Sequence, residues 1–178
     1  MPFGPRLTGE CVILRPAVAA DRPARQRLGR HAEIAKMFGA ARPSSGPMSA
    51  EAAAAWFERL GGSGSVEWVV EADGAFLGTA RLHSFGGDGA RYAVRFDDPD
   101  RLGRGFGTEV TNMVVEYAFA TLGLQRIDLA VLEFNERAIR CYTRCGFVQI
   151  GRAANAAVVD GTPYDDILMA LVRARLVQ

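Results

Sequence analysis

The sequence predicts a mixed α/β fold in a single domain spanning residues 1–178. Three observations support this: 178 residues suffice for one domain with a core, 49% of them are hydrophobic, and strand-like and helix-like segments occur along the whole chain. No linker, repeat or low-complexity block divides the sequence. Runs of strands with helices between them favour a sheet of about six to seven strands with helices on both faces.

The individual elements follow from hydrophobic periodicity and from breaker residues. Strand-like patterns occur at residues 10–15, 66–72, 76–83, 90–96, 126–132, 147–152 and 166–172. Helical patterns occur at residues 19–37, from Ser49 to the Gly61–Gly62 pair, at 105–122 and at 135–146. The first of these helices can be divided in two pieces.

Local signals place the boundaries of these elements. Pro16 ends the first strand, and Pro23 suits the first turn of the helix that follows. Ser49 is a typical N-cap. The Asp73–Gly74 pair predicts a tight hairpin between two strands, and Asp88–Gly89 predicts the next turn.

A glycine-rich turn opens the helix at residues 105–122. Its sequence from Arg101 to Glu109 is RLGRGFGTE. Such a turn brings backbone N–H groups close to an anion, and the helix that follows adds its first-turn donors and the positive end of its dipole. The spacing fits neither a dinucleotide fingerprint nor a P-loop. By itself the turn is equally compatible with an ordinary strand-to-helix connection.

A second segment begins at Asn135, directly after the strand at residues 126–132. Asn135 can cap the next helix, in which Ala138, Ile139 and Tyr142 lie near one face. Gly146 ends this helix before a further strand.

Together these two segments resemble the GNAT superfamily of N-acetyltransferases, in the branch of the ribosomal-protein N-terminal acetyltransferases and their relatives. The pyrophosphate loop of that family matches residues 102–107, and its Asn-x-x-Ala-x-x-x-Tyr-x-x-x-Gly-Phe segment matches residues 135–147. The Leu14-Arg15-Pro16 opening and the stretch at residues 164–169 are also similar. Leu102 departs from the pattern, which has Arg or Gln there. Because backbone amides bind the phosphate in this family, the departure does not change the assignment.

The resemblance implies a central, mostly antiparallel sheet that splays between its fourth and fifth strands, and acetyl-CoA as the cofactor. The cofactor loop would span residues 102–109. The implied cofactor-binding residues are Arg95, Phe96, Leu102, Gly103, Arg104, Gly105, Phe106, Gly107, Thr108, Asn135 and Ala138. A backbone N–H near Arg95 or Phe96 would polarise the thioester carbonyl.

Tyr142 is the expected general acid, because a phenol with a pKa near 10 is suited to protonating a departing thiolate. Glu133, just past a strand end, is the expected base; Asp97, Asp98 and Glu109 are rival candidates, and transfer of the proton through water is the alternative to a side-chain base. Each of these side chains also has a structural interpretation: Tyr142 in the core, Asn135 as a simple cap, and Glu109 favoured by the helix dipole.

The expected activity is transfer of an acetyl group to a primary amine by direct attack in a ternary complex. The acceptor could be a protein N-terminus or a small molecule, and its identity stays open. The loop at residues 39–47, with Met37 and Phe38 before it, is expected to border the acceptor site. The alternative is a non-catalytic acyl-CoA-binding regulatory domain.

Composition also bears on the protein's partners, location and metal content. A formal net charge of +1 gives no basis for nucleic-acid binding. No run reaches the about 18 apolar residues of a membrane span, which favours a cytoplasmic protein. The cysteines, Cys11, Cys141 and Cys145, show no metal spacing, so no metal is expected. Homodimers are common in such folds, but no segment specifies an interface.

Overall fold

The computed structural model describes residues 3–174. Its strands are β1 (Leu7–Thr8), β2 (Val12–Arg15), β3 (Ser65–Ala72), β4 (Ala75–Gly86), β5 (Gly89–Phe96), β6 (Arg126–Leu132), β7 (Val148–Val159) and β8 (Thr162–Val172). Its α-helices are α1 (Asp21–Leu28), α2 (Ala32–Met37), α3 (Ala50–Glu58), α4 (Phe106–Glu116) and α5 (Glu136–Arg144). A 3₁₀ turn, η1 (Pro99–Arg101), precedes α4, and a π-helical turn, η2 (Tyr117–Thr121), follows it.

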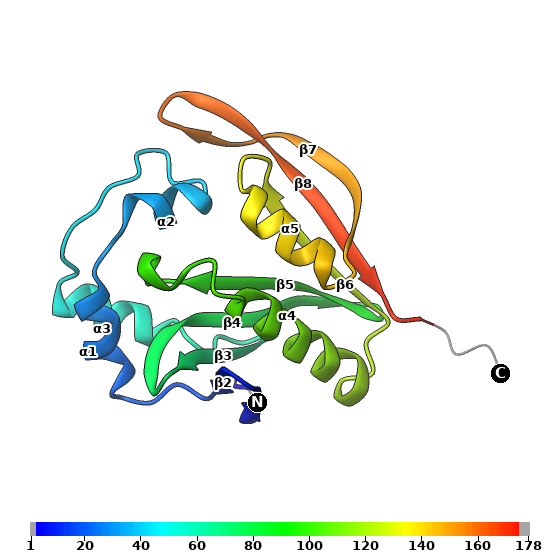
Figure 1. Ribbon diagram of the computed structural model, residues 1–178, viewed down its shortest axis with the longest axis horizontal. Helices are drawn as coiled ribbons and strands as arrows, with labels where there is room; N and C mark the ends of the chain where they lie inside the picture. Colours follow the sequence, from blue (N-terminus) through cyan, green and yellow to red (C-terminus); the bar gives the residue numbers. More distant parts are fainter. Residues whose placement is uncertain (1–2, 175–178) are drawn as a thin grey trace.

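The described strands form one eight-stranded sheet in the order β1-β2-β3-β4-β5-β6-β8-β7 (Figure 1). All neighbouring strands are antiparallel except β5 and β6, which run parallel. The predicted mixed α/β fold with a mostly antiparallel sheet is therefore confirmed.

The sheet opens between β5 and β6. These strands pair only at one end, where residues 89–91 face residues 126–128. Beyond this point β5 continues to Phe96 while β6 continues along β8 to Leu132, which pairs with Asp166. The splay was predicted between the fourth and fifth strands, at residues 90–96 and 126–132. The same two segments are β5 and β6 in the structure, because the short β1 was not predicted and adds one strand at the start.

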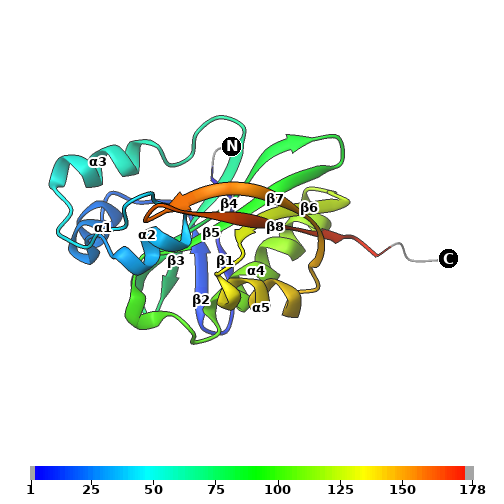
Figure 2. The same cartoon turned by 90° about the horizontal axis from the view of Figure 1, so that it is seen from above.

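Helices pack on both faces of the sheet. Helices α4 and α5 lie side by side on the face turned to the viewer in Figure 1. On this side Val110, Val114 and Ala118 are fully buried in the core. The view from above shows α3 on the other side of the molecule (Figure 2), where Trp56 packs edge-on against Phe76 of β4 with ring centroids 5.5 Å apart.

Most predicted boundaries agree with the structure. The helix at residues 19–37 is divided into α1 and α2, Ser49 accepts a hydrogen bond from the Ala52 N–H (3.2 Å), and β6 begins and ends as predicted. The hairpin turn at Asp73–Gly74 has positive φ at both residues, as its type requires. The next turn lies at residues 87–88, one residue earlier than predicted.

The last two strands are longer than predicted. Strand β7 extends to Val159, and β8 begins at Thr162 rather than at Asp166. Register shifts interrupt the β7–β8 pairing between Gln149 and Gly151 and between Ala153 and Ala157. Such bulges disturb the two-residue alternation on which strand prediction depends, so the extension was not visible in the sequence.

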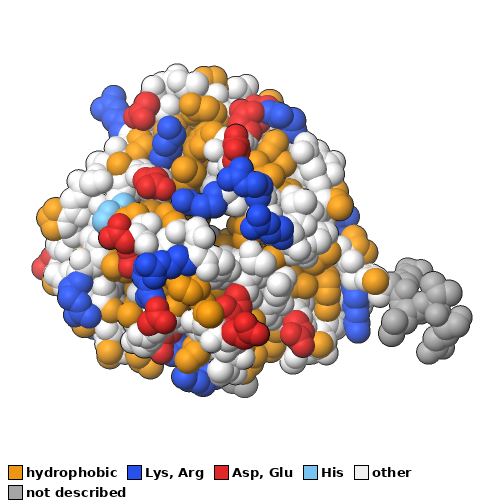
Figure 3. Space-filling model, viewed as in Figure 1, with side chains coloured by type: hydrophobic (Ala, Val, Ile, Leu, Met, Phe, Trp, Pro, Cys, Tyr) orange, Lys and Arg blue, Asp and Glu red, His pale blue; other side chains and the backbone are white. Residues whose placement is uncertain are grey.

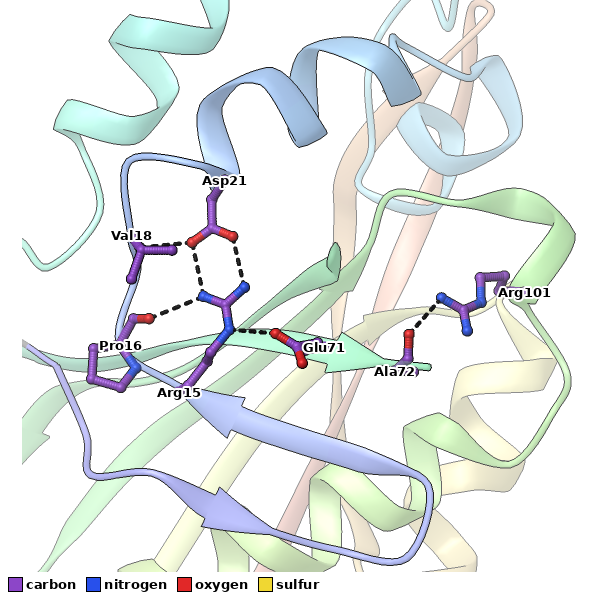
Figure 4. Close-up of polar contacts among 7 residues, drawn as sticks. All are labelled: Arg15, Pro16, Val18, Asp21, Glu71, Ala72 and Arg101. Atoms are coloured by element: carbon purple, nitrogen blue, oxygen red, sulfur yellow. Dashed lines mark hydrogen bonds and ion pairs between the residues drawn. The ribbon is translucent and has the colours of Figure 1, made fainter. Parts of the chain in front are cut away.

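The Leu14-Arg15-Pro16 opening anchors α1 to the sheet. The Arg15 guanidinium donates two hydrogen bonds to Asp21 (2.9 and 2.8 Å) and one to Glu71 of β3 (2.6 Å), as Figure 4 shows. The hydrogen bond to Asp21 is the main reason that the pKa of Arg15 is raised above its usual range. At the end of β3, Arg101 donates to the Ala72 carbonyl (3.0 Å). Strand β3 thus holds both the start of α1, through Arg15, and the turn before α4, through Arg101.

Candidate active site at the opening of the sheet

A cleft of about 600 Å³ occupies the opening between β5 and β6. Its lining comes from α2, β5, the glycine turn, β6, α5, β7 and β8. In the space-filling view a hollow lies near the middle of the face that carries α4 and α5, with lysine and arginine side chains gathered around it (Figure 3). Three arginines of α5 line this cleft: Arg137, Arg140 and Arg144.

Most of the predicted site residues meet in this cleft. Those that line it are Phe96, Leu102, Gly103, Gly105, Gly107, Thr108, Asn135, Ala138 and Tyr142. Four predicted site residues are not among the lining residues: Arg95, Arg104, Phe106 and Glu133. Phe106 is buried in the core instead, and Arg104 is exposed to solvent.

The glycine turn presents unpaired backbone donors. Gly103 and Gly105 have φ of 80° and 89°, a region that favours glycine. Within the described residues, no N–H group of residues 103–107 has a hydrogen-bond acceptor. Consecutive free amides at a helix N-terminus form an anion-binding concavity.

Gly107 has a different role in the same turn. A Cβ at this position would lie 3.3 Å from Cys141 Sγ and 3.4 Å from the Phe96 ring. The glycine therefore allows α4, α5 and β5 to approach one another closely. In contrast, a Cβ at Gly103 or Gly105 would meet no other atom within 4 Å, since these positions face open space.

Helix α5 brings Asn135 and Tyr142 to the opposite wall. The Asn135 side-chain oxygen accepts from the Ala138 N–H (3.2 Å), which confirms the predicted cap. The side-chain nitrogen has no partner among the described residues, so capping leaves it available to a ligand. The cap and the binding role are thus compatible.

The Tyr142 ring packs among aromatic side chains while the residue lines the cleft. It lies edge-on to Tyr92 (6.3 Å between centroids) and tilted against Phe147 (6.0 Å). Its hydroxyl has no hydrogen-bond partner among the described residues. Burial raises the pKa of this hydroxyl above its usual range, and the nearby Cys141 and Cys145 add to the shift. Tyr142 is therefore a protonated donor over the whole neutral range.

The backbone of β5 turns two N–H groups toward the opening. The Asp97 N–H donates to the Leu77 carbonyl of β4 (2.9 Å). Because hydrogen bonds alternate along an antiparallel pair, the N–H of Arg95 faces β4 as well, whereas those of Val94 and Phe96 face the splayed side. Of the two N–H groups predicted to polarise the thioester carbonyl, those of Arg95 and Phe96, only that of Phe96 therefore points toward the opening.

The carboxylates considered as bases are occupied elsewhere. Glu133 pairs with Arg152 and accepts from the Asp165 N–H (3.0 Å). Glu109 accepts from the Cys11 N–H (2.9 Å), and Asp98 caps η1. Asp97 is 2% exposed and is paired with Arg25 and Arg95.

Two features of the cleft were not anticipated from the sequence. One is Asp166, which lies beside Leu132 only because β6 and β8 pair. The other is the row Arg137, Arg140 and Arg144; their three- and four-residue spacing puts them on one side of α5, a signal that the sequence did contain. Met37, Phe38 and Gly39 also line the cleft, whereas residues 40–47 of the loop expected to border the acceptor site are not among the lining residues.

The described part of the chain contains no group of three or more His, Cys, Asp or Glu side chains arranged to hold a metal ion. Among the helices within residues 3–174, none has the length and apolar character needed to cross a membrane.

The opening of the sheet thus has the glycine turn on one side and the capped helix that carries Tyr142 on the other. The family model described as an acetyltransferase (GNAT) domain matches residues 12–148. The chain belongs to this family, as the sequence resemblance predicted.

Several curated proteins are similar in sequence. The chain is 30% identical over 113 residues to the uncharacterized N-acetyltransferase YoaA of Bacillus subtilis, covering 62% of this chain and 64% of that protein. It is 33% identical over 69 residues to the spermidine N(1)-acetyltransferase of Vibrio cholerae, covering 39% of each. The putative ribosomal N-acetyltransferase YdaF of Bacillus subtilis is 25% identical over 150 residues, covering 83% of this chain and 79% of YdaF. The first two alignments span less than two thirds of these relatives' length.

Solved structures share the fold over most of the chain. The spermidine N-acetyltransferase from Vibrio cholerae, in complex with CoA and spermine, superimposes with a TM-score of 0.76 at 21% identity, covering 92% of this chain and 96% of that one. RimJ of Mycobacterium smegmatis, in complex with CoA-disulfide, gives a TM-score of 0.74 at 22% identity, covering 94% and 84%. At these identities the likeness concerns the fold.

Proposed function

We propose that the protein transfers an acetyl group from acetyl-CoA to a primary amine by direct attack in a ternary complex. One observation carries the proposal: Gly103, Gly105 and Gly107, whose amides have no acceptor among the described residues, line one cleft at the opening of the sheet together with Asn135 and Tyr142. The relatives whose names include N-acetyltransferase, and the CoA bound in a structure of the same fold, support it.

In this proposal the glycine turn binds the pyrophosphate of the cofactor. Its free amides and the α4 dipole attract the negative charge. The pantetheine arm extends along the open edge of β5, where its amide groups can pair with the backbone, and the side-chain nitrogen of Asn135 donates to it. The Phe96 N–H then polarises the thioester carbonyl as negative charge develops on its oxygen.

The acceptor amine attacks the thioester carbon while Tyr142 protonates the departing sulfur. A new C–N bond forms, the C–S bond breaks, the thiolate takes the phenolic proton, and water then returns a proton to the phenolate. The phenolic pKa, raised by burial, keeps that proton available until the thiolate forms. Since Glu133 is held by Arg152 and Asp165, we propose that the amine loses its own proton to water.

A thiol-release assay with acetyl-CoA and a panel of amines and N-terminal peptides tests this function. Release that depends on both substrates, together with mass-spectrometric detection of an acetylated amine, is the expected result. A sequential kinetic pattern supports direct attack, whereas a ping-pong pattern would contradict it. Binding of CoA without turnover for any amine would contradict the proposed activity.

A further inference from the structure

Asp166 lies at the wide end of the opening. It is the residue of β8 that pairs with Leu132, four positions beyond the last β5–β6 pair, which is at Asp128. The next residue, Ile167, packs in the core shared with α4 and α5. Because successive side chains of a strand alternate, Asp166 points to the opposite side of the sheet. It therefore borders the cleft away from the glycine turn.

Within the described residues, Asp166 is the acidic side chain among those that line the cleft. Its carboxylate forms no hydrogen bond and no ion pair with another described residue. The adjacent Asp165 is different, because its carboxylate accepts from Arg152 (3.2 Å) and from the Asn155 N–H (3.0 Å). Asp166 is thus a half-buried anion that no described cation contacts directly, although Arg91 is close enough to affect its pKa.

The side chains around this end of the cleft are apolar. Leu132 and Ala130 come from β6, Ala156 and Ala157 from β7, and Phe38 from the end of α2. The positive side chains of the cleft are all on α5, at the wall that also carries Asn135. Among the described residues that line the cleft, a single acidic side chain therefore lies beside apolar side chains, and the arginines lie on α5. Arg95, outside the lining, stacks over the Phe38 ring at 4.8 Å from its centroid.

From this arrangement we infer that Asp166 binds the ammonium group of the acceptor and that the acceptor is a monoamine with an apolar body. Before attack the bound ammonium gives one proton to water, and the lone pair of the neutral amine then forms the C–N bond. This inference rests on the proposed function and names the class of its second substrate. One carboxylate neutralises one ammonium group, and a charged group left unpaired in an apolar site is costly. A polyamine would place further ammonium groups against alanine, leucine and phenylalanine side chains or near the arginines of α5.

Burial agrees with this role. Desolvation raises the pKa of the Asp166 carboxyl, and the positive charge of Arg91 on β5 offsets only part of the rise. The other charged groups nearby are Asp128 of β6, which pairs with Arg126, and the cluster of Glu133, Arg152 and Asp165. A bound ammonium would supply the missing positive charge.

Calorimetric titration with three probes tests the inference, with and without saturating CoA. The probes are 2-phenylethylamine, its neutral analogue 2-phenylethanol, and spermidine. We expect 2-phenylethylamine to bind more tightly than the other two. Asp166→Asn should weaken its binding about tenfold or more, as expected for loss of a charged hydrogen-bond partner, while changing CoA binding and 2-phenylethanol binding less than about twofold.

Asp128→Asn is the matched control, because Asp128 lies on a neighbouring strand and does not line the cleft. It should leave the binding of 2-phenylethylamine unchanged. Tighter binding of spermidine, no binding of 2-phenylethylamine, or equal effects of the two variants would overturn the inference.

The kinetic counterpart separates this inference from the proposed function. Asp166→Asn should raise the KM for the amine without raising that for acetyl-CoA. If the unmodified enzyme acetylates amines but the variant keeps the same amine KM, only the assignment of Asp166 fails. If CoA does not bind at all, the proposed function fails, while the titrations without CoA still report on Asp166.

Discussion

The hydroxyl of Thr108 lies 3.5 Å from the thiol of Cys141. This contact joins the glycine turn to α5, two segments about thirty residues apart in the sequence. The Cys145 thiol is the other neighbour of Cys141, and hydrogen bonding from it is the main cause that lowers the pKa of Cys141; Thr108 and Thr111 add to the effect. The thiol thus lies in the cleft directly beside the proposed phosphate site.

The first prediction concerns the reactivity of this thiol. Iodoacetamide should alkylate Cys141 in the free protein, and CoA should protect it, because the cofactor covers the cleft. Peptide mass spectrometry measures the modification at each cysteine. Cys11 is exposed and lies outside the lining of the cleft, so it should react equally in both samples. Equal labelling of Cys141 with and without CoA would contradict the placement of the cofactor.

The second prediction separates the loss of stability from the loss of CoA affinity when a glycine is replaced. Gly105→Ala and Gly123→Ala both put a side chain at positive φ in open space, so each should lower the free energy of unfolding by about 1–2 kcal/mol. Only Gly105 lines the cleft. CoA affinity, measured by calorimetry, should therefore fall for Gly105→Ala and stay unchanged for Gly123→Ala. A similar loss in both variants would indicate a general effect of stability.

The third prediction concerns proton donation. Tyr142→Phe should reduce kcat about a hundredfold or more while leaving CoA affinity nearly intact, because only the hydroxyl is removed. Tyr92→Phe is the control: Tyr92 is buried beside Tyr142, and its hydroxyl is paired with Thr111 at 3.1 Å. This control should lose some stability but keep kcat. Turnover of Tyr142→Phe at the original rate, with chemistry rate-limiting, would refute the acid role.

The fourth prediction concerns stability and pH. The pKa of Asp166 is raised in the folded protein above its ordinary value of 3.8. The folded state therefore binds more protons than the unfolded state between these two values, and its stability falls as the pH rises through this range. Asp166→Asn removes this ionisation. Its free energy of unfolding should therefore equal that of the unmodified protein below about pH 3.8, exceed it increasingly as the pH rises, and keep a constant excess above the pKa of folded Asp166.

Denaturant unfolding at a series of pH values measures this excess. A constant difference between Asp166→Asn and the unmodified protein at all pH values would show that Asp166 experiences no desolvation in the fold.

The sequence was sufficient for the elements whose signals are local. Ser49 and Asn135 cap their helices through their own side chains, and the Asp73–Gly74 turn needs only its two residues. The glycine turn and the α5 segment were likewise predicted from short motifs, and the residues that line the cleft include nine of those named in advance.

Features that depend on pairing between distant segments could not be predicted in this way. The bulges of β7 have no alternating pattern, and Asp166 reaches the cleft only through the register of β8 against β6. Glu133 illustrates the reverse case. Its position after a strand suggested a free carboxylate, but Arg152 of β7, nineteen residues later in the chain, pairs with it.

The divergence of β5 from β6 leaves a strand edge inside the molecule. Exposed edges invite pairing with other polypeptides, and proteins commonly protect them by covering or charging them. Here the unpaired amides of Val94 and Phe96 face a cleft bounded on the opposite side by α5 and the β7–β8 hairpin. A narrow chain with its own amide groups can enter such a space more readily than a second polypeptide strand with side chains on both faces. Cofactor binding would then complete the hydrogen-bonded ladder of the sheet, and the free enzyme would be a sheet that lacks one strand.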